Sequence, residues 1–104
     1  MAYKVHLTKI AERQLDDIIF YTINVLKNIQ AAINVWEDAL QTIQNLEYSA
    51  GAFSLCQEDE LSVHGYRRVH FKNHDYLMLY LIEGDTVYID RIYHELQDYK
   101  NLPH

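Results

Sequence analysis

Apolar residues recur at helical spacing over most of the first half of the chain. Between Ile19 and Ile43 the gaps alternate between three and four residues, the pattern of a helix with one apolar stripe. The stripe consists of Leu15, Ile18, Ile19, Thr22, Leu26, Ile29, Ile33, Trp36, Leu40 and Ile43. One helix of that length would far exceed the usual ~12 residues, and Asn28 is a suitable helix cap. We therefore predict two antiparallel helices with a turn near Lys27 and Asn28, and we place Trp36 in the core.

Strand patterns lie on both sides of this helical region. Residues 3–7 alternate, and Thr8 can cap the helix that follows. Residues 66–72 also alternate, which places Arg68 and His70 on one face and Arg67 on the other. Two further strands are predicted at residues 76–82 and 86–93. The first of these two is continuously apolar, as expected of a central strand covered on both faces.

Turn and cap residues separate these elements. Residues 49–51 end the second helix, and residues 73–75 and 83–85 carry the chemistry of tight turns. Residues 94–101 can form a short final helix. The order β-α-α-β-β-β-α predicts an α+β fold in which a two-helix hairpin packs on an antiparallel sheet. At 104 residues we expect a single domain, residues 1–104.

The distribution of charge narrows the function. The net charge is −6, and residues 28–64 hold six acids with no lysine or arginine. Residues 65–94 contain four bases and four acids, so the sequence shows no basic stripe. Nucleic-acid binders draw much of their affinity from neutralising phosphates. The sequence therefore disfavours a direct, high-affinity nucleic-acid surface.

The cysteine count and the apolar runs indicate which cellular compartment the protein occupies. Cys56 is the single cysteine, so no internal disulfide forms, as in proteins of a reducing compartment. No signal peptide is recognisable, and no apolar run approaches the ~20 residues of a membrane span. The acidic run 58–60 is typical of a solvated loop rather than a metal site. We expect a soluble cytoplasmic protein with no membrane partner, no metal and no cofactor.

Residues spread along the whole chain resemble the RelE/ParE superfamily of bacterial toxins, and most closely its ParE branch. The matching features are the opening strand, the run 11–21 with Leu15-Asp16-Asp17-Ile18, Gln30-Ala31-Ala32, Gly65-Tyr66-Arg67-Arg68, Tyr80, Arg91-Ile92-Tyr93-His94, Asp98-Tyr99 and Leu102. The resemblance implies the toxin of a type II toxin–antitoxin module of the plasmid stabilisation or addiction kind. Such a toxin inhibits growth and is neutralised by a cognate antitoxin.

The resemblance leaves two activities open, because ParE toxins inhibit DNA gyrase by binding it and RelE toxins cleave mRNA in the ribosomal A site. Cleavage needs a base, an acid and cations for the phosphorane charge. A partial nuclease set could be built from Arg67, Arg68, His70, His94 and Tyr99. However, Leu77 stands where an arginine is usual, and residues 94–98 lack the usual basic run. We favour gyrase binding, with a RelE-like nuclease acting on ribosome-bound mRNA as the alternative, or a degenerate member that only binds antitoxin.

Under the gyrase hypothesis the working surface lies at the ends of the last strands and in the tail. The residues expected to bind the target or partner are Arg68, Arg91, Tyr93, His94 and Tyr99. Aromatic and arginine side chains are the usual anchors of protein interfaces, because they bury large areas and form directional hydrogen bonds.

The antitoxin is expected in an exposed apolar groove of the sheet and helix pair. The acidic character of this chain predicts lysine or arginine in the antitoxin, facing Glu37, Asp38 and residues 58–60.

Overall fold

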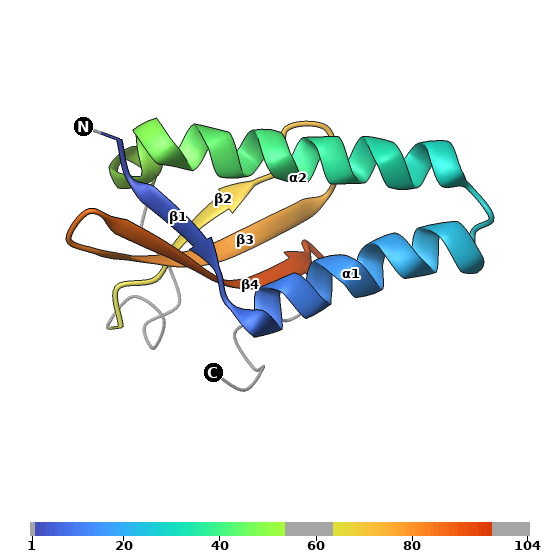
Figure 1. The fold of residues 1–104 in the computed structure, drawn as a ribbon, viewed down its shortest axis with the longest axis horizontal. Coiled ribbons are helices and arrows are strands. Elements are labelled where there is room, and N and C mark those ends of the chain that lie inside the picture. The colour runs from blue at the N-terminus through green and yellow to red at the C-terminus, as the bar shows by residue number, and fades with distance from the viewer. Residues whose placement is uncertain (1, 54–63, 97–104) are drawn as a thin grey trace.

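The computed structural model describes residues 2–53 and 64–96. The elements in chain order are β1 (Lys4–Leu7), α1 (Lys9–Asn24), α2 (Ile29–Ser49), a 3-10 turn η1 (Ala50–Ala52), β2 (Arg67–His70), β3 (Tyr76–Glu83) and β4 (Thr86–His94). The two helices form a hairpin over one face of a four-stranded sheet (Figure 1). The predicted α+β order is confirmed as far as β4. The predicted tail helix is not: His94 belongs to β4, and residues 97–101 lie outside the described part of the chain.

The sheet has the order β1-β4-β3-β2 and is mixed. The pairs β2–β3 and β3–β4 are antiparallel, whereas β1 pairs with β4 in parallel. The prediction of a wholly antiparallel sheet is therefore wrong at this edge. The error has a physical cause: tight turns force the last three strands to alternate in direction, but two helices and two strands separate β1 from β4 and permit either direction.

Side-chain caps fix both ends of the helix hairpin. Thr8 Oγ1 accepts a hydrogen bond from the Ala11 N–H at 3.2 Å, and Asn28 Oδ1 accepts one from the Ala31 N–H at 2.9 Å. Lys27 adopts a left-handed backbone with φ of 55°, which reverses the chain within a short turn. Both predicted caps and the predicted turn are confirmed.

The buried face of α2 is not the face that its large apolar residues define. The buried residues of this helix are Ala32, Val35, Asp38, Ala39, Thr42 and Leu46. Trp36 is 44% exposed, and Ile29, Ile33 and Leu40 are exposed beside it. The placement of Trp36 in the core is therefore wrong. Small side chains bring the α2 backbone close to the neighbouring layers, and the large residues are left on the flank of the helix.

Strand β3 lies at the centre of the sheet and is buried on both faces. Met78 and Tyr80 join the main core under the helices. Leu77 and Leu79 point to the opposite face, where they form a second cluster with Tyr93. This arrangement confirms the prediction of a central strand covered on both sides. In the described ranges, no helix is both long and apolar enough to span a bilayer.

Candidate functional site

Side chains from three strands form two rows on the sheet face away from the helices, which we call the far face. Strand pairing makes the first row Arg68, Leu79 and Arg91, and the second row His70, Leu77 and Tyr93. The members of the two rows are two residues apart along each strand, so they share one face. The structure therefore brings Arg68, His70, Arg91 and Tyr93 together, and the alternation predicted for Arg68 and His70 is confirmed.

A β-bulge is what turns Arg91 toward the far face. Leu79 pairs with Arg91 while its neighbour Tyr80 pairs with Ile89, so Asp90 has no counterpart on β3. An extra residue in one strand reverses the alternation of side chains beyond it. Ile89 therefore packs under the helices, whereas Arg91, two residues later, lies on the opposite face.

Asp90 organises the polar groups at this bulge. Its carboxylate accepts a hydrogen bond from the Tyr66 hydroxyl at 2.8 Å and lies 3.2 Å from Arg91 Nη1. Arg91 Nη1 also donates to the Asp90 carbonyl oxygen at 2.8 Å. Arg91 is only 8% exposed and Tyr93 only 2%. These two side chains form the floor of the far face rather than its outer surface.

The phenols of the far face are held in their neutral form. Burial, followed by the hydrogen bond to Asp90, raises the pKa of Tyr66 to about 12. Burial also raises the pKa of Tyr93, although the Arg91 guanidinium opposes that shift. Neither hydroxyl is therefore ionised at neutral pH, and neither is suited to remove a proton from a substrate.

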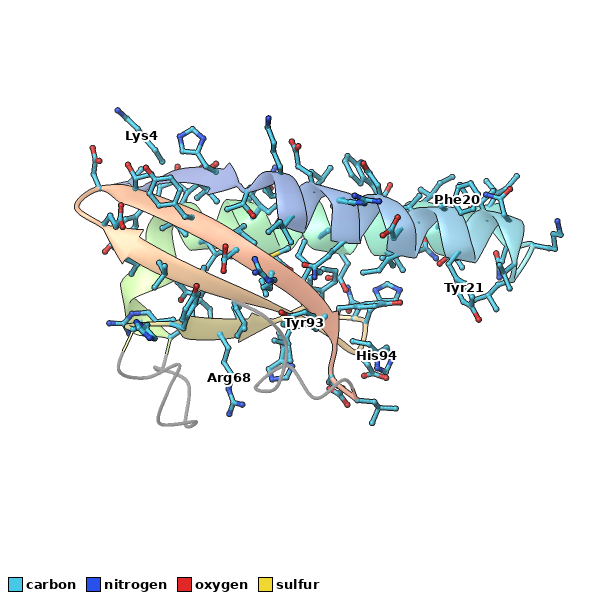
Figure 2. All side chains as sticks on the ribbon, turned by 90° about the horizontal axis from the view of Figure 1, so that it is seen from below. Lys4, Phe20, Tyr21, Arg68, Tyr93 and His94 are labelled. Atoms are coloured by element: carbon cyan, nitrogen blue, oxygen red, sulfur yellow. The ribbon has the colours of Figure 1, made fainter. Side chains whose placement is uncertain are left out.

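Arg68 and His70 are the more accessible members of the two rows. Arg68 is half-buried and projects away from the sheet (Figure 2). His70 is exposed, and its Nδ1 lies 3.9 Å from Glu95 Oε2. Both partners of that pair are in contact with solvent, so the pair is worth at most ~1 kcal/mol.

Two other predicted site residues, Arg67 and His94, do not join this face. Arg67 pairs with Tyr80 on the helix side of the sheet, and its guanidinium donates to the Phe53 carbonyl oxygen. His94 pairs with Tyr76 on β3, and their rings form a T-shaped contact with a centroid distance of 5.3 Å. The residues proposed for a nuclease are thus divided between the two faces. Tyr99 lies outside the described residues.

A second candidate surface is a groove between the helices and the edge strand, which the large residues left exposed on α2 create. We call it the basal groove; its volume is about 500 Å³ and it is lined by Val5, His6, Leu7, Glu12, Leu15, Asp16, Trp36, Leu40 and Ile43. Its α2 wall is apolar, β1 contributes His6 beside Val5 and Leu7, and the exposed carboxylates of Glu12 and Asp16 lie on its α1 wall. Sequence analysis expected an apolar groove of the sheet and helix pair but did not identify its residues, because it placed Trp36 in the core.

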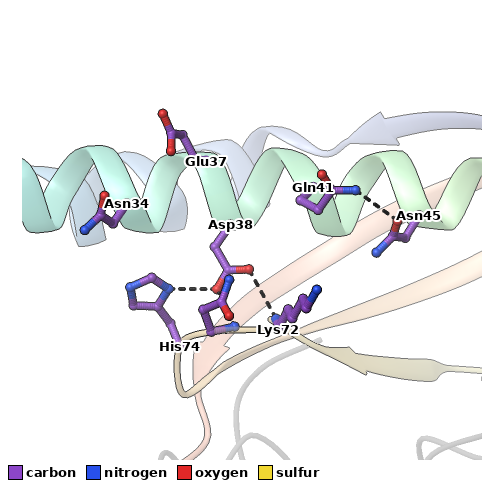
Figure 3. Close-up of a pocket in the computed structure, with 8 residues that line it drawn as sticks. Asn34, Glu37, Asp38, Gln41, Asn45, Lys72 and His74 are labelled. Carbon is purple, nitrogen blue, oxygen red and sulfur yellow. Dashed lines mark hydrogen bonds and ion pairs between the residues drawn. The ribbon is translucent and has the colours of Figure 1, made fainter.

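A third candidate surface is a hollow of about 710 Å³ between α2 and the β2–β3 turn (Figure 3). Asp38 is 4% exposed and reaches across this gap from α2. Its carboxylate accepts hydrogen bonds from the backbone N–H groups of Lys72 at 3.2 Å and Asn73 at 2.9 Å, and lies 2.7 Å from His74 Nδ1. Asp38 therefore fixes the turn to the helix and cannot face an antitoxin side chain as predicted. No cluster of three metal-ligating side chains occurs in residues 2–53 or 64–96.

Together these features define a class of small α+β protein: a capped helix hairpin on a mixed four-stranded sheet, with an arginine-bearing far face. The sequence of residues 5–99 matches the family of the ParE toxin of the type II toxin–antitoxin system parDE. The chain belongs to this family.

Solved structures support the same fold. A chain of the chromosomal ParDE toxin–antitoxin system from P. aeruginosa superimposes with a TM-score of 0.74 at 19% identity, covering 89% of this chain and 96% of that one. A conserved hypothetical protein from Helicobacter pylori, HP0894, gives a TM-score of 0.54 at 19% identity, with 88% and 92% covered. No curated protein sequence matches this chain significantly.

Proposed function

We propose that this protein is the growth-inhibiting toxin of a type II toxin–antitoxin pair, that a cognate antitoxin neutralises it, and that it acts by binding DNA gyrase. Membership of the ParE family supports the toxin role. We favour a binding mechanism because of the far face. On it, the accessible side chains of Arg68 and His70 lie next to the buried side chains of Arg91 and Tyr93.

The far face is better suited to binding than to cleaving RNA. The Arg91 guanidinium is buried and paired with Asp90, so it is poorly placed to meet a phosphorane. Arg67 and His94 lie across the sheet from Arg68. A projecting arginine above a well-packed aromatic floor is, in contrast, the usual form of a protein-binding anchor.

The proposal is tested with purified protein in a gyrase supercoiling assay. We expect inhibition by the wild type and a loss of about tenfold or more in Arg68→Ala, as for an anchor worth ~2 kcal/mol. Lys4→Ala is the matched control, because Lys4 is an exposed cation on β1, at the opposite edge of the sheet (Figure 2). Equal activity of the two variants would argue against the far face.

Two other outcomes would replace the gyrase proposal. Cleavage of mRNA at defined codons in a translation extract, lost in Arg68→Ala, would establish the nuclease alternative. Normal growth on induction, with intact binding of the antitoxin encoded by the adjacent gene, would establish a degenerate member.

For the antitoxin we propose the basal groove as the main contact. Its apolar α2 wall, chiefly Trp36 and Leu40, fits one face of an amphipathic helix. Glu12 and Asp16 on the opposite wall favour a lysine or arginine at the edge of that helix. The lysine or arginine predicted in the antitoxin would here face Glu12 and Asp16 rather than Asp38; Glu37 is exposed, and residues 58–60 lie outside the described part of the chain.

A further inference from the structure

The end of the helix hairpin forms an apolar surface that continues along α2 from Trp36, and we call it the hairpin tip. It is formed by the exposed residues Phe20, Tyr21, Ile23, Val25, Leu26, Ile29 and Ile33. The α1–α2 turn projects past the ends of the strands (Figure 1), and Phe20 and Tyr21 lie on two sides of α1 at this end (Figure 2). We infer that the hairpin tip binds the hairpin tip of a second copy of this chain.

The charge pattern of the tip supports a second copy as the occupant. The chain carries a net charge of −6, so two copies repel one another in most orientations. Residues 18–36 contain no acid, and Lys27 is their single charged residue. The tip is therefore the part of the helix pair through which two acidic chains can approach at little electrostatic cost.

The exposed area is close to what a weak dimer requires. Phe20 is 66% exposed and Tyr21 52%. An aromatic side chain presents ~150–250 Å², so these two alone expose roughly 200 Å². With the five aliphatic residues the total exposed apolar area of the tip is on the order of 600 Å², spread over both sides of α1, and it is below the ~800 Å² per partner of a standard interface. We therefore expect a weak dimer, with a Kd in the micromolar range.

Two-fold symmetry can fix how two hairpin tips are aligned with each other, which directional groups on the tip do not do. The amide of Asn24 donates to the Phe20 carbonyl oxygen, and the amide of Gln30 donates to Asn34, so both are engaged within their own helices. A different protein would need directional groups to fix its orientation on such a surface. Two identical tips related by a two-fold axis need none, because the axis sets their alignment. Two overlapping hairpins pack as four helices and leave both sheets at the outside.

This inference does not depend on the target of the toxin, and sedimentation equilibrium of the full chain tests it. We expect a monomer–dimer equilibrium in the wild type at micromolar concentration. The double variant Phe20→Glu with Leu26→Glu should weaken dimerisation at least 100-fold, because it places acids against acids. Tyr48→Glu is the matched control, since Tyr48 is an exposed aromatic residue near the other end of α2. Circular dichroism checks that all three proteins are folded.

A crosslinking experiment provides an independent measurement. In a Cys56→Ser background, Leu26→Cys should crosslink to itself with a short bis-maleimide, whereas Tyr48→Cys should not. A wild type that stays monomeric throughout the micromolar range would overturn the inference. So would a dimer that persists in the double variant. Loss of antitoxin binding in the double variant, without any wild-type dimer, would assign the tip to the antitoxin and likewise overturn it.

Discussion

Asp38 is a charged side chain with almost no contact with solvent. Its burial is tolerated because two backbone N–H groups and the His74 imidazole surround the carboxylate. The spacing of residues along α2 indicates that Asp38 is buried. Asp38 lies three residues after Val35 and four before Thr42, and both of these residues are buried. An acid at that spacing on a packed helix face requires a partner, which the β2–β3 turn supplies.

Replacing Asp38 by asparagine should destabilise the protein. The amide has one accepting oxygen, and its NH₂ group would oppose the backbone donors. We expect Asp38→Asn to lower the free energy of unfolding by about 2–4 kcal/mol, measured by urea denaturation. Glu37→Gln, one position away and exposed, should change it by less than ~0.5 kcal/mol. Similar values for the two variants would show that Asp38 does not hold the turn.

Tyr66 should make stability depend on alkaline pH. Its pKa is raised from 10.0 to about 12 in the folded state, so the folded protein retains this proton longer than the unfolded chain does. The stabilisation is fully present below pH 10 and is lost as the pH rises toward 12. We expect Tyr66→Phe to show a smaller fall in the free energy of unfolding over this range than the wild type. Tyr88→Phe, at an exposed site, should follow the wild-type curve. A parallel curve for Tyr66→Phe would contradict the assigned shift.

At the scale of elements, α2 shows why periodicity alone misplaced a face. Hydrophobic size defines a stripe through Ile33, Trp36 and Leu40, but the helix buries Ala32, Val35 and Ala39 instead. Both stripes have helical spacing, so spacing cannot rank them. Close packing selects the small residues, because they let the helix backbone approach its neighbours. The caps and turns were predictable because they depend on residues only a few positions apart.

The basal groove yields a prediction about antitoxin binding. Trp36→Ala removes a partly exposed ring from the apolar wall and should weaken binding by at least tenfold. Glu12→Lys reverses a wall charge and should weaken binding more at low salt than at high salt. Isothermal titration with the antitoxin measures both effects. Tyr48→Ala, which removes an exposed aromatic ring that does not line the groove, should bind normally. Unchanged affinity of Trp36→Ala would place the antitoxin elsewhere.

At the scale of the whole molecule, the candidate site was partly predictable. Alternation in residues 66–72 separates Arg68 and His70 from Arg67, and the structure agrees. Alternation could not place Arg91, because the bulge at Asp90 reverses the pattern. A bulge depends on how β3 and β4 are aligned, and this alignment cannot be read from the sequence of one strand alone. The direction of the β1–β4 pair escaped prediction for the same reason.

The parallel pairing of β1 with β4 also has a consequence for how the protein folds during its synthesis. Lys4 pairs with Thr86 and Leu7 with Ile89, so the first strand finds its sheet partner almost at the other end of the chain. During synthesis β1 must wait until residues 86–89 have left the ribosome before it can pair. Contacts between such distant residues form slowly, since a long loop must close first. The sheet is therefore complete only after β4 has been synthesised and the long loop between β1 and β4 has closed.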